Sequence, residues 1–481
     1  MLLSRILDHA EHHPNRIAIG SDGREINYAE FAKTLLKIRA RIIEALPPAP
    51  GIALLNCGSL ANQWFLNIAL RSLGITTAIM RDYVTADKLA QLPGTMFVCT
   101  SQDVAAAVRR RWPDMPILAI TKASVDAATG DDPQSISGET RFGDNIEFTS
   151  GSTGDPKILI RSGAAVEAFW TRTAAEFHIN QNSVFHLQNL AAFTAVGGKL
   201  PLTCWAMGGS AIFDHRTDWL LHLFDLPINR LFAPPALIKV LASRTFPNPP
   251  AGLQIYCGGG FLAGGLVTDL RKRLPSKVFL NYGGTEFGVR LQNEIETSDD
   301  AVWLRPTPNN DLRLVDDTGQ PARDGEEAMI QVKRHSCDPI PLFEDKHGGP
   351  AVAIGEFFST NDLGIRRADG RIRLVGRAGE TLNVGGQKRS LGVLEQRARD
   401  ILGVESLCLL VRQADNGEDY LTVAVEGDQT IDKAAVNTFL KDLGAKFYRT
   451  EFRRFFTFPR EASGMQKVDR RQLQRLIEQP K

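Results

Sequence analysis

Short apolar runs alternate with longer stretches of helical spacing over the first three fifths of the chain. The apolar runs have strand length and cover residues 51–56, 76–81, 94–100, 116–120, 208–213 and 253–260. Between them lie segments whose apolar residues recur every three or four positions, such as 59–74 and 165–177, while 229–243 is typical of a strand that leads into a helix. This alternation is typical of a mainly parallel sheet covered by helices on both faces. We therefore predict an α/β fold, preceded by a helix, a strand pair over 16–28 and a helix over 28–46.

The pattern changes from about residue 300. Short strands separated by Gly and Asp turns, at 310–322, 328–334 and 370–380, predict a small antiparallel, barrel-like sheet. The last hundred residues have the composition of a separate α+β module, with a hairpin over 406–428 and a helix over 433–444. We expect an N-terminal core domain over 1–377 and a small mobile C-terminal domain over 378–481.

Composition narrows the class of protein. The 481 residues carry 56 basic and 55 acidic side chains, so the net charge of +1 favours neither nucleic acid nor an anionic membrane. No stretch approaches the roughly 18 apolar residues of a membrane span, and charges interrupt the N-terminal segment where a signal peptide would be apolar. The six cysteines are far apart, without a C-x-x-C pair. We expect a soluble, cytoplasmic protein with buried thiols and no disulfide framework.

Residues 148–162, FTSGSTGDPKILIRS, concentrate hydroxyls and glycines beside one lysine. Glycines let backbone N–H groups approach phosphate oxygens, hydroxyls add donors, and a lysine adds a point charge. Such a loop can surround a polyphosphate. In isolation the stretch is more typical of a solvated turn.

Four further stretches carry candidate chemistry. LQIYCGGGFL (253–262) ends a strand in three glycines, against whose bare backbone a flat ring could lie, and NYGGTEFG (281–288) places an aromatic, a threonine and Glu286 at a strand end. STNDLGIRRADGRIRLVGRAGE (359–380) carries Asp362 and Arg377, and FPREASGMQKVDRRQL (458–473) carries Lys467. Taken singly, these stretches are typical of turns or solvated loops.

Together and in this order, the five stretches resemble the superfamily of adenylate-forming enzymes. This superfamily of AMP-dependent synthetases and ligases includes acyl-CoA synthetases, aryl-acid ligases, peptide-synthetase adenylation domains and luciferases. The resemblance covers nearly the whole chain, and TSGSTGDPK with YGGTE is a highly specific pair. It implies activation of a carboxylic acid by ATP and Mg²⁺ as acyl-AMP, followed by transfer to the thiol of CoA or of a carrier protein's phosphopantetheine.

The resemblance also implies a role for each matching residue. The ATP phosphates would be bound by Thr149, Ser150, Gly151, Ser152, Thr153, Gly154 and Lys157. Gly259, Gly260 and Tyr282 would form the adenine slot, Asp362 would bind the ribose, and Arg377 would bind the ribose or a phosphate. Thr285 would contact the α-phosphate, Glu286 would hold Mg²⁺, and Lys467 would bridge the carboxylate and the α-phosphate. The acid pocket would include Phe193, Gly197, Gly258 and Gly284, and the pivot of the C-terminal domain would lie at Gly379.

Several positions depart from the family pattern. Ile158 follows the loop lysine where glycine is usual, Gly379 replaces an Asp or Lys hinge, and Lys467 follows an apparent two-residue insertion. The intact residues favour adenylation, whereas these departures weaken the expectation of a thioester-forming step. The alternative is a degenerate paralogue that binds a nucleotide or acyl-adenylate without turnover.

The phenylalanines and glycines of the pocket favour an aryl or medium-length acid over an amino acid. The sequence does not name the acid, the acceptor thiol or the oligomeric state. Five arginines near the C-terminus would suit a carrier protein or the CoA phosphate, and are equally typical of a solvated helix face: Arg453, Arg454, Arg460, Arg470 and Arg471.

Overall fold

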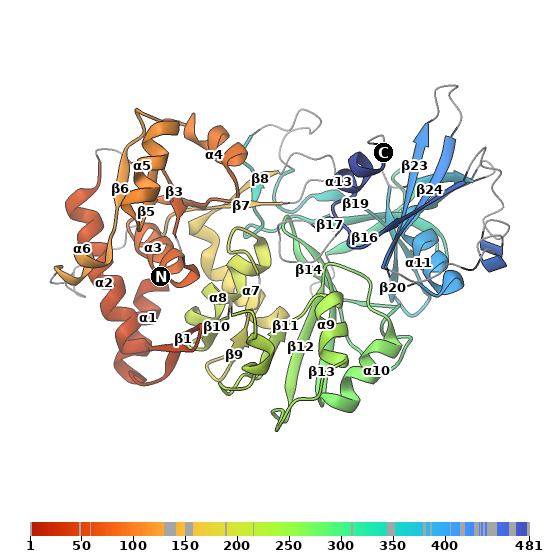
Figure 1. The fold of residues 1–481 in the computed structure, drawn as a ribbon, viewed down its shortest axis with the longest axis horizontal. Coiled ribbons are helices and arrows are strands. Elements are labelled where there is room, and N and C mark those ends of the chain that lie inside the picture. The colour runs from red at the N-terminus through yellow and green to blue at the C-terminus, as the bar shows by residue number, and fades with distance from the viewer. Residues whose placement is uncertain are drawn as a thin grey trace. The chain divides into compact units, whose positions relative to one another are not determined.

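The computed structural model in Figure 1 describes most of the chain. The described residues are 2–47, 50–57, 59–128, 141–149, 157–187, 190–214, 216–308, 311–343, 352–378, 381–384, 387–404, 406–413, 419–427, 432, 434–435, 438–439, 450–460 and 468–478. They form two compact units. The first takes in the residues up to Val289 and those from Arg334 to Ile354, and the second takes in Arg290–Lys333 and those from Gly355 onwards. The expected boundary between a core and a mobile domain after residue 377 stays a prediction.

The first sheet of the first unit has seven strands in the order β18-β8-β7-β4-β3-β5-β6. Their bounds are β3 Ile52–Asn56, β4 Thr76–Ile79, β5 Met96–Cys99, β6 Ile117–Ala119, β7 Asn145–Phe148, β8 Ile158–Arg161 and β18 Ile340–Pro341. The five strands β7-β4-β3-β5-β6 are parallel, and β8 and β18 continue the sheet antiparallel. The helices between these strands are α3 Leu60–Ser72, α4 Tyr83–Ala90, α5 Gln102–Arg111 and α6 Lys122–Asp126.

A second sheet of this unit contains seven neighbouring strands in the order β13-β12-β11-β9-β10-β1-β2. They are β1 Ile17–Ser21, β2 Arg24–Asn27, β9 Val184–His186, β10 Ser210–Phe213, β11 Arg230–Phe232, β12 Leu253–Gly258 and β13 Ser276–Gly284. All are parallel except the β1–β2 hairpin. The accompanying helices are α1 Leu2–His12, α2 Tyr28–Ala45, α7 Val166–Glu176, α8 Ala195–Ala206, α9 Pro235–Ala242 and α10 Gly264–Arg273.

The main core of the first unit joins residues of both sheets through helices α2, α3, α7 and α8. Aromatic rings fill it: the Trp205 ring lies 5.2 Å from that of Phe31 and 5.8 Å from that of Trp64. Burying such rings removes large apolar areas from water, which is the main favourable term in folding. A second cluster packs α4 and α5 against the first sheet. The α/β architecture predicted from the alternating pattern is confirmed.

The second unit is built from antiparallel strands and a small α+β module. A four-stranded antiparallel sheet has the order β16-β17-β19-β20, with β16 Leu312–Val315, β17 Glu327–Lys333, β19 Phe357–Arg366 and β20 Ile372–Arg377. Two short strand pairs are β14 Gly288–Glu294 with β15 Arg305–Pro306, and β21 Thr381–Val384 with β22 Gln387–Ser390. The module has β23 Leu407–Gln413, β24 Asp419–Glu426 and β25 Thr450–Phe455, with α11 Leu391–Leu402 and α13 Arg470–Glu478. The predicted antiparallel sheet and the 406–428 hairpin are confirmed.

Candidate active site

The phosphate-loop stretch connects two antiparallel strands. Phe148 of β7 pairs with Ile158 of β8, and the Thr149 N–H donates to the Lys157 carbonyl at 3.1 Å. Residues 150–156, which include the predicted Ser150, Gly151, Ser152, Thr153 and Gly154, lie outside the described residues. Because β7 is parallel to β4, the loop starts at the carboxyl edge of the sheet, where open α/β sheets bind ligands. Ile158 is buried in the core beneath the hairpin, which accounts for an apolar residue after the loop lysine.

Arg81 adds a cation at the base of this loop. It follows β4, and its Nη1 donates to the Thr149 carbonyl at 3.3 Å, while its Nε lies 3.3 Å from the Asp82 carboxylate. Asp82 in turn caps α4 by accepting from the Thr85 N–H at 2.8 Å. Sequence reasoning missed Arg81. The signal was a basic residue directly after a strand that neighbours the strand carrying the loop.

The glycine cluster lies at the carboxyl end of β12. Gly258 is buried, and an added Cβ would meet the Asn281 carbonyl at an ordinary 3.5 Å. Gly259 has a φ of +81°, a left-handed conformation that favours glycine, and it and Gly260 are exposed. Since Gly258 is the register partner of Asn281 on β13, the cluster lies beside the start of the YGGTE stretch.

Thr285 and Glu286 form a turn directly after β13. Both side chains are half-buried, and Tyr282 before them is buried with its ring 5.9 Å from that of Phe287. At Gly283 a Cβ would lie 2.3 Å from the Gly288 carbonyl oxygen, so the backbone passes too closely for any larger residue. The structure thus brings the glycine cluster and the Thr285–Glu286 turn to one edge of the second sheet, as the sequence predicted.

Of the predicted acid-pocket residues, Phe193 lies against the hairpin that β7 and β8 form. Phe193 is half-buried, its ring is 6.3 Å from that of Phe148, and its carbonyl accepts from the Phe148 N–H at 3.2 Å. It contacts both core clusters of the first unit. Gly197 is buried in the first turn of α8, where a Cβ would lie 2.2 Å from the Ala191 carbonyl oxygen, and Gly284 is half-buried at the end of β13.

Asp362 and Arg377 are cross-strand partners in the second unit. They face each other in the β19–β20 register, and the Arg377 Nε lies 3.4 Å from the Asp362 carboxylate. The Arg377 side chain is 44% exposed, so its charge is available to a ligand. Two other predicted residues, the hinge Gly379 and the lysine Lys467, lie outside the described residues.

His186, at the carboxyl end of β9, belongs to the core. It is 2% exposed and its ring stacks on Trp219 with centroids 5.3 Å apart. Burial lowers the pKa of His186 to about 4, an effect that the nearby Asp214 carboxylate opposes and Arg216 reinforces. The imidazole is therefore neutral at physiological pH, as suits a residue of the core.

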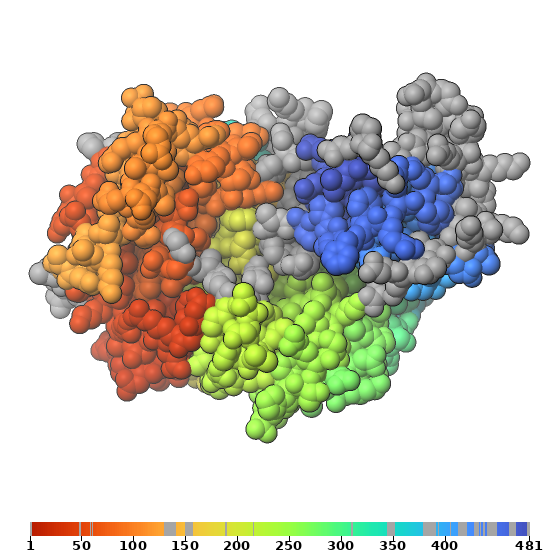
Figure 2. Space-filling view, in the orientation of Figure 1, coloured from red at the N-terminus to blue at the C-terminus, as the bar shows by residue number. Residues whose placement is uncertain are grey.

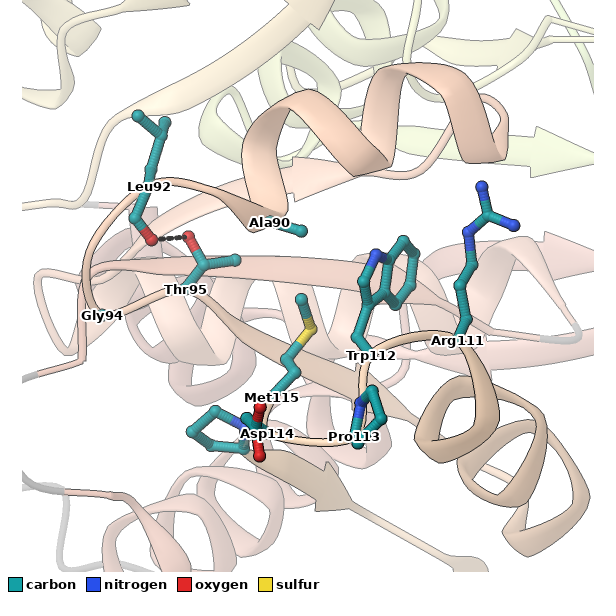
Figure 3. Close-up of a pocket in the computed structure, with 10 residues that line it drawn as sticks. Ala90, Leu92, Gly94, Thr95, Arg111, Trp112, Pro113, Asp114 and Met115 are labelled. Atoms are coloured by element: carbon teal, nitrogen blue, oxygen red, sulfur yellow. Dashed lines mark hydrogen bonds between the residues drawn. The ribbon is translucent and has the colours of Figure 1, made fainter.

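A pocket of about 370 Å³ lies at the opposite edge of the first sheet (Figure 3). It is lined by Thr95 and Pro116, which precede β5 and β6, and by the side chain of Trp112. Helices α4 and α5 beside it, orange in Figure 2, form part of the molecular surface. Since this edge carries the amino ends of the parallel strands, the pocket is separate from the candidate nucleotide-binding edge.

Ion pairs account for three of the five C-terminal arginines. Arg453 pairs with Glu451, Arg460 with Glu426 and Arg470 with Glu395. Arg454 and Arg471 are exposed. The positive charge that this module offers a partner is therefore smaller than the sequence suggested.

Among the described residues, no group of three or more His, Cys, Asp or Glu side chains could hold a metal ion. A Mg²⁺ ion that arrives with ATP needs only one or two protein carboxylates, because phosphate oxygens and water complete its shell. The half-buried Glu286 at the sheet edge fits such a site. Within the same part of the chain, no helix has the length and hydropathy required to cross a membrane.

Comparisons with known proteins agree with this geometry. Residues 100–337 match the family described as AMP-binding enzyme, and this range contains the hairpin, the glycine cluster and the Thr285–Glu286 turn. A mitochondrial acyl-coenzyme A synthetase of Homo sapiens is 25% identical over 255 residues, which are 49% of this chain and 43% of that protein. The D-alanine–D-alanyl carrier protein ligase of Bacillus licheniformis is 24% identical over 372 residues, 70% of this chain and 71% of that one. This chain thus spans less than half the length of the human relative.

The fold is shared with solved structures. O-succinylbenzoate coenzyme A synthetase of Bacillus subtilis, in complex with ATP and magnesium ion, superposes with a TM-score of 0.79 at 17% identity, over 98% of this chain and 99% of that one. A structure of the same enzyme with its acyl-adenylate intermediate superposes with a TM-score of 0.78, over 99% of this chain and 98% of that one. Residues 100–337 therefore match the AMP-binding enzyme family, and the chain has the fold of the adenylate-forming ligases.

Proposed function

We propose that this chain activates a carboxylic acid with ATP and transfers the acyl group to a thiol. In the first step a carboxylate oxygen attacks the α-phosphorus, the bond between the α-phosphorus and its bridging oxygen breaks, and pyrophosphate leaves. In the second step a thiolate attacks the acyl carbon, the mixed-anhydride bond breaks, and AMP leaves. The thiol belongs to CoA or to the phosphopantetheine of a carrier protein.

The observation that carries the proposal is the convergence of three motifs within residues 100–337. A Ser/Thr/Gly/Lys loop follows a parallel strand at its carboxyl end, and a glycine cluster and the Thr285–Glu286 turn share the corresponding edge of the second sheet. The family match covers all three. The relatives' names, an acyl-coenzyme A synthetase and a carrier protein ligase, support the reaction class.

The residue roles follow from charge. Attack of a carboxylate on a phosphate brings two anions together, so cations aimed at the phosphoryl oxygens lower the barrier. Lys157 and the loop hydroxyls would hold the β- and γ-phosphates, and Lys467 would offset the charge between carboxylate and α-phosphate. Glu286 would hold the Mg²⁺ ion, which supplies positive charge to the phosphates when bound. Asp362 would bind the ribose, Arg377 the ribose or a phosphate, and Tyr282 with Gly259 and Gly260 would contain the adenine.

The second step requires a change at the site, because the acyl-adenylate must be protected from water and then presented to the thiol. We propose that residues 378–481 pivot at Gly379 between the two steps. Glycine at the pivot favours free rotation. The Phe193 pocket suits an aryl or medium-length acid.

The test is ATP–pyrophosphate exchange with a panel of aryl, fatty and amino acids. Exchange with one acid class, lost in Lys467→Ala and retained in a control with the exposed Lys33→Ala, is the expected result. Exchange that survives Lys467→Ala would show that another residue is the adenylation lysine. Folded protein that supports no exchange with any acid would favour the degenerate nucleotide-binding paralogue.

A product assay separates the two steps. Incubation of active protein with ATP, the acid and either CoA or a phosphopantetheinylated carrier protein is expected to yield a thioester with one acceptor. Hydroxylamine trapping of acyl-AMP without a thioester from either acceptor would limit the function to adenylation.

A further inference from the structure

Six charged side chains pair with one another near the Thr285–Phe287 turn in the first unit; five of them are buried, and that of Arg172 is 11% exposed. This buried charge layer consists of three acids and three bases: Glu147, Arg161, Arg172, Glu176, Lys199 and Asp338. Its pairs are close: Arg161 to Glu147 at 2.8 Å, Arg172 to Asp338 at 2.7 Å, and Lys199 to Glu176 at 3.1 Å. Equal numbers of opposite charges offset the cost of removing each charge from water.

Two members of the layer hold the backbone of the turn. The Arg161 Nη2 donates to the Thr285 carbonyl at 3.4 Å, and the Val289 N–H donates to the Glu176 carboxylate at 3.1 Å. A third member lies directly below: a Cβ at Gly288 would be 2.9 Å from the Arg172 guanidinium. The segment that carries Glu286 is thus attached to the layer on both sides.

Arg161 connects this turn to the phosphate-loop hairpin, which consists of β7, β8 and the predicted phosphate loop between them. It ends β8, four residues after Lys157, and both its Nε and Nη2 donate to Glu147 of β7, at 2.8 and 2.9 Å. Its Nη1 donates to the Cys337 carbonyl, and the guanidinium stacks on Phe169 at 4.2 Å. Both side chains of the pair are less than 8% exposed. One guanidinium therefore joins β7, the Cys337 segment and the Thr285 turn.

We propose that Arg161 is a positioning residue that fixes the Thr285–Glu286 turn relative to the phosphate-loop hairpin. The inference rests on the proposed function, in which these two segments bind opposite ends of the same triphosphate. An arginine suits this task because its planar fork sets several directions at once, whereas a lysine supplies one point charge. Misplacement of catalytic groups by about 1 Å can cost on the order of 100-fold in rate.

The test replaces the guanidinium of Arg161 with the ammonium of a lysine, which keeps the positive charge. In Arg161→Lys we expect kcat of ATP–pyrophosphate exchange to fall about 10- to 100-fold with little change in KM for the acid. Without any substrate, we also expect faster hydrogen–deuterium exchange in a peptide that spans 283–289, with unchanged exchange in β3.

Arg71→Lys is the matched control. The Arg71 guanidinium is also buried and stacks on Phe142 at 4.2 Å, and its 2.8 Å hydrogen bond goes to the Gly143 carbonyl and not to the turn. We expect it to lower stability without changing exchange in 283–289. Equal effects of the two variants on that peptide and on kcat would overturn the proposal, as would an Arg161→Lys variant with both values within twofold of the wild type.

A second variant covers the case in which Arg161→Lys does not fold. Glu147→Gln keeps an acceptor for the guanidinium and removes its charge partner, and we expect changes in the same direction but smaller. Unchanged exchange in 283–289 would again refute the inference. If the wild type forms no adenylate, the proposed function fails, while the deuterium uptake still decides whether Arg161 holds the turn.

Discussion

The buried histidine at the end of β9 makes a sharp prediction about pH. His186 is neutral in the folded chain because burial lowers its pKa to about 4, below its ordinary value of 6.5. In the unfolded chain the imidazole is in water and takes up a proton at the ordinary pKa. Between pH 6.5 and about 4 the unfolded state therefore binds up to one more proton than the folded state, and the free energy of unfolding falls as the pH is lowered.

The size of the effect follows from the two pKa values. The interval between 6.5 and about 4, at about 1.4 kcal/mol per pH unit, amounts to about 3 kcal/mol of stability that is fully present above pH 6.5. About 2 kcal/mol of it is lost by pH 5, because most of the unfolded chain is then protonated. The two nearby charges act in opposite directions, since Asp214 raises the pKa of His186 and Arg216 lowers it, and they are paired with each other.

The assay compares urea unfolding at pH 7.5 and pH 5 for the wild type and His186→Gln, whose side chain does not titrate. We expect the variant to lose about 2 kcal/mol less than the wild type between the two pH values. Trp219→Phe is the control, since it weakens packing on the histidine and leaves the titrating group in place. An equal pH dependence in wild type and His186→Gln, or an imidazole pKa near 6.5 by NMR, would refute the reasoning.

Three further predictions concern the site and the thiols. Gly283→Ala should destabilise the chain by about 1–3 kcal/mol in thermal unfolding and reduce pyrophosphate exchange, because its Cβ would lie 2.3 Å from the Gly288 carbonyl oxygen. Gly258→Ala should cost less than about 1 kcal/mol, because its Cβ would lie 3.5 Å from the Asn281 carbonyl oxygen. Equal losses in the two variants would contradict this prediction. Arg377→Ala should raise KM for ATP about tenfold, while the free energy of unfolding changes by less than about 1 kcal/mol, because the Arg377 side chain is 44% exposed and its Nε lies 3.4 Å from the Asp362 carboxylate. An unchanged KM would remove Arg377 from the proposed nucleotide site. All six cysteines are buried with raised pKa values. A thiol-specific reagent should therefore label fewer than one cysteine per native chain and six after denaturation. Rapid labelling of the native protein would contradict the burial of these thiols.

Much of the fold was predictable because its signals are local. The runs 51–56, 76–81 and 253–260 became β3, β4 and β12, since an apolar run of strand length can be buried only in a sheet covered on both faces. The pairing of Asp362 with Arg377 was also within reach, because two strands joined by a short turn place such residues opposite each other.

The buried charge layer could not be found in this way. Glu147 interrupts the strand β7 and Arg161 ends the strand β8, and either one alone resembles an exposed residue of an edge strand. Only the register of the hairpin, with Glu147 opposite Leu159, brings the two charges together diagonally. The contacts with Thr285 and Val289 join residues more than a hundred positions apart, which no local pattern encodes.

The position of Phe193 has a consequence for protein engineering. The ring belongs to the predicted acid pocket and also packs against Phe148 and both core clusters. A smaller residue at 193, introduced to admit a bulkier acid, would leave a void that two cores share, and large-to-small changes at such places cost about 2–5 kcal/mol. Directed evolution of substrate choice in this chain would therefore select compensating changes in the cores together with any change at Phe193.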